Sequence, residues 1–203
     1  MGLNWRQRQK QELRRQIYDT SVELFVAHGY EATTVRQITE ALGLAKGTFF
    51  NHFPSKEHVV AEWYDGITQR SLAAARERST TEAEAVDDTE DVIGSLFADM
   101  AAQATRVPEL LIAKSSHGTH PLLVEAERAQ VEGLLAFLRE HCEGAVRRGG
   151  VAESLDVEAF CGLLVAVLTG TSRSWVTSDP RFDFPETIRR RVSFLFRAAR
   201  AGH

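Results

Sequence analysis

The sequence of 203 residues predicts an all-α protein. Apolar residues recur at spacings of three and four along most of the chain, which is the period of an amphipathic helix. The five prolines lie where this periodicity breaks, so they separate helices and do not interrupt them. Strand signals are missing from the sequence, because no stretch alternates β-branched with polar residues and no Asn-Gly or Asp-Gly turn joins two such stretches.

End signals define the first two helices. An apolar stripe over 13–28 predicts the first helix, and Gly29 follows it as a residue type that commonly terminates helices. Thr34 and Gln37 have the spacing of a capping box, so the second helix is expected to open at Thr34. Gly43 ends this second helix.

Two more helices follow directly. A short one is expected over about 45–52, where Phe49 is the buried residue and Pro54 closes the segment. The next begins behind Ser55, which acts as its N-cap, and its apolar stripe continues to about Arg78.

The rest of the chain predicts five further helices. An acidic segment at 79–91 lacks large apolar residues and is expected to be a solvated loop or a weak helical extension. Apolar stripes and flanking prolines and glycines place the helices after it at about 91–106, 109–116, 122–148, 156–177 and 185–201. The sequence contains no visible internal repeat.

Composition excludes several classes of protein. Hydrophobic residues make up 43% of the chain and charged residues 26%, which is too apolar for a disordered protein. The longest uncharged stretch, 159–172, is shorter than the roughly 20 residues of a membrane-spanning helix. No apolar segment of a secretory signal follows the N-terminus, so we expect a cytoplasmic protein without a membrane segment. Cys142 and Cys161 fit neither a zinc site nor a disulfide framework, and we expect reduced, buried thiols.

Charge is unevenly distributed along the chain. The formal net charge is −4, yet residues 1–60 carry eight basic against six acidic residues, and the remainder carries 16 against 22. This asymmetry favours a polyanion as the partner of the N-terminal part, although an imbalance of this size also arises by chance. The basic residues Arg6, Arg8, Lys10, Arg14 and Arg15 form an N-terminal arm, which either adds affinity for DNA or is a solvated tail.

The second and third predicted helices have the spacing of a helix–turn–helix. They are joined by Leu42-Gly43-Leu44 and flanked by a helix on either side. Gly43 suits the turn because its backbone adopts angles that side chains resist. Two short helices with a glycine turn also occur in all-α proteins that bind no DNA, so the arrangement alone does not decide the function.

The outward side chains of the third helix suit a DNA groove. Lys46 can reach a phosphate, and Gly47 lets the helix end approach the DNA backbone closely. Thr48 offers a methyl and a hydroxyl group to base edges, and Asn51 and His52 can hydrogen-bond bases or phosphates. The residues predicted from this face are Lys46, Gly47, Thr48, Phe50, Asn51 and His52, with Lys56 as a second phosphate contact.

Residues 33–57, TTVRQITEALGLAKGTFFNHFPSKE, closely resemble the DNA-reading part of the TetR family of bacterial transcriptional regulators. The likeness spans about residues 12–63 and includes FVAHGY at 25–30. It implies an all-α homodimer with an N-terminal DNA-binding domain over 1–54 and a C-terminal ligand-binding and dimerisation domain over 55–203. The positions at which the family contacts DNA are Thr34, Lys46, Gly47, Phe50, His52 and Lys56.

Two positions depart from the family pattern. The family usually has serine where this chain has Ala45, which removes a hydroxyl that caps the third helix, a loss of about 1 kcal/mol. It commonly has tyrosine where this chain has Phe50, which keeps the ring and loses a hydroxyl that can bond a phosphate. DNA binding is therefore expected to depend more on Lys46, His52 and Lys56.

The C-terminal part predicts a dimer interface. Residues 160–171 are apolar on every side, which indicates a helix that is covered all round, either inside its own core or by a second copy. Small residues at every fourth position let another helix approach, and the last helix has a matching apolar stripe. The predicted interface residues are Gly162, Ala166, Gly170, Ile188, Val192, Leu195 and Phe196.

Candidate ligand-lining residues are large or polar side chains on the helices that should surround a cavity. They are Phe97, Met100, His117, His120, Phe137, His141 and Trp175. Each of these side chains also suits ordinary core or surface, and the histidines have no fixed metal-site spacing, so we predict neither a metal nor a cofactor.

The sequence therefore favours a ligand-responsive transcriptional repressor, which binds palindromic operator DNA as a homodimer and is released by a small-molecule inducer. Alternatives are a regulator whose C-terminal part docks a protein partner, or an activator. An enzyme is not expected, because no nucleophile, base and orienting residue stand at a recognisable spacing.

Overall fold

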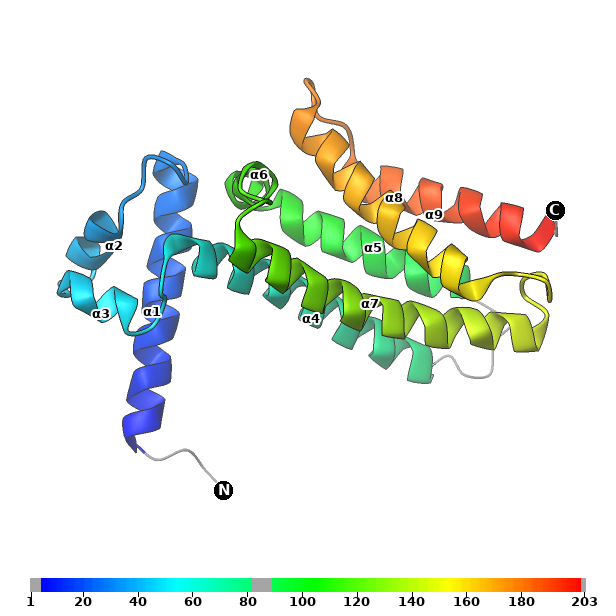
Figure 1. The fold of residues 1–203 in the computed structure, drawn as a ribbon, viewed down its shortest axis with the longest axis horizontal. Coiled ribbons are helices and arrows are strands. Elements are labelled where there is room, and N and C mark those ends of the chain that lie inside the picture. Colours follow the sequence, from blue (N-terminus) through cyan, green and yellow to red (C-terminus); the bar gives the residue numbers. More distant parts are fainter. Residues whose placement is uncertain (1–4, 82–88, 202–203) are drawn as a thin grey trace. The chain divides into compact units, whose positions relative to one another are not determined.

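A computed structural model describes residues 5–81 and 89–201, without the side chains of 79–81 and 201. These residues form nine α-helices and no strand, in the order that the sequence predicts (Figure 1). The helices are α1 (Trp5–His28), α2 (Val35–Ala41), α3 (Lys46–Phe50), α4 (Lys56–Thr81), α5 (Thr89–Thr105), α6 (Pro108–Ser116), α7 (Pro121–Arg148), α8 (Val157–Thr177) and α9 (Phe184–Ala201). The prediction of an all-α fold is confirmed.

The start of α1 is the one large departure from the predicted helix boundaries. The helix begins at Trp5, well before the apolar stripe that opens at Leu13. Residues 5–12 are mostly arginine, glutamine, lysine and glutamate, which are good helix formers but leave no periodic apolar signal. The loop expected over 79–91 lies mostly outside the described residues, and α4 and α5 occupy its two ends.

The chain divides into two compact units. The first contains the residues up to Trp63 together with Val107–Val124, and the second contains the rest of the described chain. Helix α4 supplies its first turns to the first unit and its remainder to the second. The division into domains over 1–54 and 55–203 stays a prediction.

A small aromatic core holds the first unit together. Phe25 of α1, Ile38 of α2, Phe49 of α3 and the following Phe53 are all fully buried, as is Ile17. Burying each of these side chains contributes about 2–3 kcal/mol. The core therefore fixes which faces of α2 and α3 point inward.

The helix-end signals in the sequence are present in the structure. The N–H of Gln37 donates to Thr34 Oγ1 at 3.2 Å, and the N–H of Thr34 donates to Gln37 Oε1 at 2.7 Å, which together make the capping box. Gly29 and Gly43 have φ angles of +85° and +65°, a region that other residues rarely adopt. The predicted start of α2 and the ends of α1 and α2 are thus confirmed.

Lys56 has a structural role that the sequence did not indicate. Its Nζ donates to the carbonyl oxygens of Tyr30 at 2.8 Å and Thr33 at 2.7 Å, and it lies 4.4 Å from the centre of the Tyr30 ring. Burial lowers the pKa of Lys56. The Tyr30 hydroxyl in turn donates to Glu57 Oε1 at 2.9 Å. Lys56 therefore joins the start of α4 to the loop between α1 and α2.

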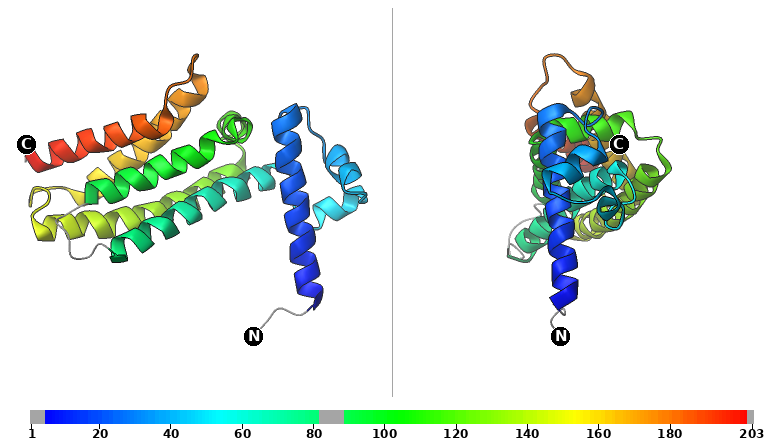
Figure 2. Two further views of the ribbon diagram at one scale, coloured as in Figure 1. Left: turned by 180° about the vertical axis from the view of Figure 1, so that it is seen from behind. Right: turned by 90° about the vertical axis from the view of Figure 1, so that its left-hand side faces the viewer.

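The second unit is a helical bundle, whose members lie side by side in Figure 1 and in the left view of Figure 2. Helix α5 is buried along most of its length, and α9 packs along it. Ile93 and Phe97 of α5 and Ile188 and Val192 of α9 are fully buried. The core of this unit therefore lies around α5.

Helix α8 is the one helix among the described residues that is long and apolar enough to cross a membrane. A core helix of a soluble protein has the same length and composition, and α8 buries Phe160, Leu164 and Leu168 in the second unit. The two cysteines, Cys142 of α7 and Cys161 of α8, form no disulfide and are buried, as predicted.

Replacement of Lys56 tests the junction between α4 and the loop after α1. We expect Lys56→Ala to lower the free energy of unfolding by about 2 kcal/mol, because two partly buried carbonyl oxygens lose a charged donor. Chemical denaturation measures this change. Lys46→Ala removes an exposed lysine and is the control, with an expected change within about 0.5 kcal/mol. Equal stabilities of the two variants would contradict the structural role of Lys56.

Candidate nucleic-acid interface

The turn between α2 and α3 has a defined geometry. After α2, the N–H of Gly43 donates to the carbonyl of Glu40 at 3.1 Å, and the N–H of Leu44 donates to that of Thr39 at 2.8 Å. The positive φ of Gly43 lets the chain reverse here. With Phe49 buried, α3 has one fixed orientation against α2.

Four of the six residues predicted to face outward at α3 are exposed. Lys46, Gly47 and Asn51 are exposed, and Phe50 is 45% exposed with its ring edge-on to Phe49. Thr48 is half-buried. An exposed aromatic ring between a lysine and an asparagine is a combination that suits contact with a phosphate backbone and base edges.

Gly47 is not required by the fold. Its φ is not positive, and a Cβ built on it would meet no atom within 4 Å. The missing side chain therefore leaves free space on the outer surface of α3. This is the arrangement expected where another molecule approaches the helix backbone closely.

His52 is half-buried just after the end of α3. Burial lowers its pKa, and the nearby charges of Lys10 and Arg14 lower it further. Its Nδ1 is buried and has no hydrogen-bond partner among the described residues. His52 therefore stays a predicted DNA contact whose Nδ1 faces the protein interior.

Two further predicted contacts have roles within the chain. The Thr34 hydroxyl is part of the capping box and also donates to Gln37 Oε1 at 2.8 Å. Lys56 uses two of its three N–H groups on the carbonyls described above, which leaves one for a phosphate. Thr34 and Lys56 stay predicted DNA contacts, with fewer hydrogen-bonding groups left for DNA.

The basic N-terminal arm is helical from Trp5 onward. Arg6, Arg8 and Lys10 are exposed on the first turns of α1, and Lys10 borders a groove of about 360 Å³ that His52 also lines. These residues therefore form an exposed, solvated helix and not a disordered tail.

The other two basic residues of the arm have partners within the first unit. Arg14 donates to the carbonyl of His52, pairs with Glu62 and stacks 4.0 Å over the Phe53 ring. Arg15 forms ion pairs with Glu12 and Asp19. The part of the arm that can face DNA is therefore the segment before Glu12.

The predicted interface residues on α8 lie on an open face. Gly162, Ala166 and Gly170 are exposed, and a Cβ on either glycine would meet no atom within 4 Å. The neighbouring Leu163 is 53% exposed. Another helix could therefore approach α8 closely along this face.

Helix α9 presents a different face from the one predicted. Ile188, Val192 and Phe196 have at most 1% of their surface exposed, because they pack into the core of their own unit. They offer no surface to a second copy, and Leu195 is half-buried. The large apolar residue on the exposed face is Phe194, which is 64% exposed.

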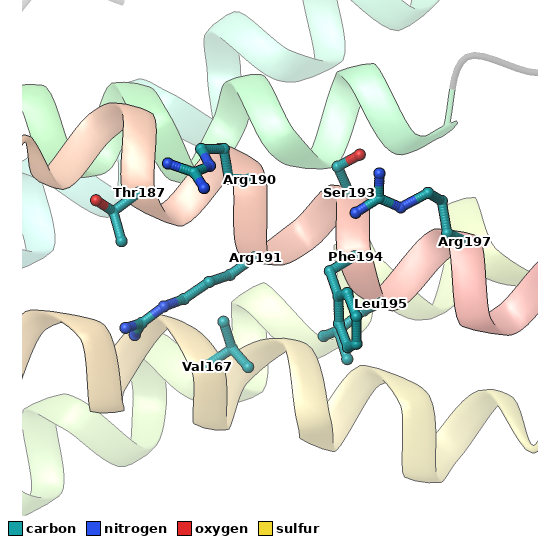
Figure 3. A pocket seen from close by; sticks show the side chains of 8 residues that line it. All are labelled: Val167, Thr187, Arg190, Arg191, Ser193, Phe194, Leu195 and Arg197. Atoms are coloured by element: carbon teal, nitrogen blue, oxygen red, sulfur yellow. The ribbon is translucent and has the colours of Figure 1, made fainter.

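Arginines surround this exposed phenylalanine. A groove of about 810 Å³ runs along α9, where Arg190, Arg191 and Arg197 line it with Phe194, and Val167 lines it from α8 (Figure 3). The exposed face formed by α8 and α9 is thus apolar in its centre and cationic along α9.

The predicted ligand-lining residues do not gather in one place. His117 and His120 belong to the first unit, where His117 Nε2 hydrogen-bonds Glu31 Oε1 at 2.5 Å and its ring packs on Tyr30. The other candidates lie in the second unit.

Most of those in the second unit are core residues with partners of their own. Phe97 and Phe137 are fully buried, His141 stacks on Phe137, and Trp175 donates its Nε1–H to a carbonyl at 3.0 Å. Of the predicted ligand-lining residues, only Met100 lines the cavity that lies between helices α4, α5, α7 and α8.

Sequence reasoning missed the polar residues of that cavity. Tyr64 and Thr68 of α4, Gln130 of α7 and Thr169 of α8 line it together with aliphatic side chains. Gln130 stands on the buried stripe of α7, four residues before Leu134. A polar residue in an otherwise apolar stripe is the signal that could have found it.

A family model and individual relatives both match this chain to bacterial transcriptional regulators. A family model for bacterial regulatory proteins of the tetR family matches residues 17–63. The HTH-type transcriptional regulator TcmR of Streptomyces glaucescens is 43% identical over 81 residues, which are 40% of this chain and only 36% of that protein. The HTH-type transcriptional repressor AcnR of Corynebacterium diphtheriae is 33% identical over 164 residues, 77% of each chain.

A solved structure shares the fold over most of the chain. FadR of Thermus thermophilus, a TetR-family transcriptional repressor in complex with lauroyl-CoA, has a TM-score of 0.66 and 26% identity. The match covers 90% of this chain and 92% of that one.

The substitution Gly47→Ala tests the role of position 47 in DNA binding separately from its role in folding. Because an added methyl meets nothing in the protein and alanine favours helix, the free energy of unfolding should stay the same or rise by up to about 1 kcal/mol. The methyl should weaken binding to duplex DNA roughly tenfold, a loss of about 1.4 kcal/mol. Fluorescence anisotropy with a labelled duplex measures this affinity, and an unchanged value would exclude close approach at Gly47.

Ala45→Ser tests the missing cap of α3. Ala45 already has the extended N-cap conformation, with φ of −71° and ψ of 144°, and makes no side-chain cap bond. A serine hydroxyl there should raise the free energy of unfolding by about 1 kcal/mol in urea denaturation. Ala41→Ser, in the last turn of α2, is the control and should lower stability by a few tenths of a kcal/mol. The same change in both variants would mean that position 45 does not cap α3.

Proposed function

Because this chain belongs to the TetR family of transcriptional regulators, we propose that it is a repressor that binds palindromic operator DNA as a homodimer and is released by a small molecule. The observation that carries the proposal is the open outer face of α3, with Lys46, Gly47, Phe50 and Asn51 exposed on a helix that its buried face holds in place. Members of this family regulate transcription, and we propose no catalytic activity. Its location is proposed to be the cytoplasm.

DNA recognition divides between two kinds of contact. Lys46 supplies a charge to a phosphate and fixes the register of α3, while Thr48 and Asn51 contact base edges. His52 lies at the edge of this face and is a further proposed contact. The basic turns of α1 before Glu12 add affinity that does not depend on the DNA sequence.

Dimerisation supplies the second reading helix. A single short helix contacts too few bases for specificity, whereas two copies about 34 Å apart reach successive major grooves and read a palindrome. The open faces of α8 and α9 support this assembly, with Leu163 and Phe194 as its apolar centre. Gly162, Ala166 and Gly170 allow the helices of two copies to approach closely.

Ligand binding in the second unit regulates DNA binding through α4. This helix lines the cavity with Tyr64 and Thr68 and continues, at its other end, into the first unit at Lys56. A ligand that binds better to one position of α4 shifts the two DNA-reading units away from the separation that the operator requires. The lauroyl-CoA complex of Thermus thermophilus FadR supports small-molecule control in a relative.

Selection of DNA fragments by the purified protein tests this function. We expect a palindrome whose half-sites lie about one helical turn apart. Lys46→Ala should weaken binding to all sequences and reduce the slope of log K against log salt by about 1, whereas Thr48→Ala should relax the preference at one base pair. Anisotropy titrations over a salt series measure both effects. A recovered sequence without two-fold symmetry would contradict the dimer, and equal salt slopes for Lys46→Ala and the wild type would contradict the phosphate contact.

A further inference from the structure

The cavity in the second unit contains a buried amide group without a partner. Gln130 of α7 is 6% exposed, and neither its Nε2 nor its Oε1 has a hydrogen-bond partner among the described residues. Buried polar side chains nearly always have such partners, because an unpaired donor or acceptor away from water is costly. Both atoms belong to a residue that lines the cavity, so they point to a bound molecule that supplies the partners.

The other walls define the chemistry of that molecule. Met100, Leu134 and Leu168 make the lining largely aliphatic, and it includes no lysine, arginine or histidine. Its one carboxylate is Glu127. A negatively charged group would therefore enter an apolar space without a cation to balance it, which strongly disfavours its binding.

The two threonines of the lining act as acceptors. Thr68 donates its hydroxyl hydrogen to the carbonyl of Tyr64 at 3.2 Å, and Thr169 donates to that of Val165 at 3.0 Å. Only the lone pairs of their oxygens remain. A ligand in the cavity is therefore expected to bring N–H or O–H donors as well as an acceptor for the Gln130 amide.

We propose that this cavity binds an uncharged, mainly apolar molecule with a carboxamide-type group, which pairs with Gln130 through one N–H···O bond in each direction. The inference rests on the proposed function, because it names the chemical class of the regulating ligand. A primary or secondary amide presents a donor and an acceptor side by side, which matches the side-chain amide of Gln130. The aliphatic walls take up the rest of the molecule.

The size of the cavity links this binding to regulation. Its volume is about 20 Å³, which matches a single water molecule. An organic ligand must therefore move the walls apart as it enters. Met100 adapts easily, because its side chain is unbranched, while Tyr64 and Thr68 carry α4 with them. Ligand entry thus displaces the helix that leads to the DNA-reading unit.

Calorimetric titration with two probes of equal chain length tests the proposal. Octanamide and octanoate share the apolar chain, and at pH 7.5 octanoate carries a negative charge and lacks N–H groups. We expect wild-type protein to bind octanamide at least tenfold more tightly than octanoate. In Gln130→Leu, which keeps the side-chain volume, the two affinities should fall within about twofold of each other.

Gln103→Leu is the matched control, since Gln103 lies outside the cavity lining and has its own partners. Its Nε2 donates to Ser71 Oγ at 2.8 Å and Asp99 Oδ2 at 3.0 Å. This variant should keep the tenfold preference for octanamide but melt at a lower temperature than the wild type without any probe. Gln130→Leu should melt no lower than the wild type, because it removes an amide that has no partner.

Three results would overturn the proposal: no binding of octanamide, a preference that survives in Gln130→Leu, or a lower melting temperature of Gln130→Leu without probe. Anisotropy titrations of the same samples with a selected DNA duplex test the proposed function separately. Octanamide should weaken DNA binding of the wild type and leave that of Gln130→Leu unchanged. Selective octanamide binding with unchanged DNA affinity would retain the site and contradict ligand-released repression.

Discussion

Burial of Phe49 determines what α3 can do. The helix from Lys46 to Phe50 is too short to be stable alone, since isolated helices of this length do not form in water. Its stability comes from the burial of Phe49 and from packing against α2, together with the turn at Gly43. Because neighbouring positions on a helix point in different directions, fixing Phe49 inward places Gly47 and Phe50 outward. The surface that we propose for DNA contact is thus a consequence of the core beneath it.

The first unit was largely predictable from the sequence, because its signals are local. A capping box needs only Thr34 and Gln37, and a left-handed turn needs only Gly43. The extension of α1 to Trp5 was not predictable from periodicity, since a helix exposed on all sides has no apolar stripe. The structural role of Lys56 was also missed, because its partners are backbone carbonyls that any residues at 30 and 33 would supply.

The helices of the second unit were predictable from the sequence, but which face of each helix is buried was not. Helix α9 has apolar side chains on more than one side, so its pattern did not show that Ile188 and Val192 point inward and Phe194 outward. The cavity was not predictable from the sequence either, since its walls come from four helices and depend on how these pack. Single residues such as Gln130 gain their meaning only from that packing.

The first unit is discontinuous along the chain, and this affects how the protein is made. Leu110, Leu111 and Leu123 are buried and belong to this unit, yet they follow Trp63 by more than forty residues. During synthesis the N-terminal helices leave the ribosome first, but the hydrophobic surface that these leucines cover stays open until α6 and the first turn of α7 have emerged. The first unit is therefore completed only after residues 64–106, the first part of the second unit, have also been translated.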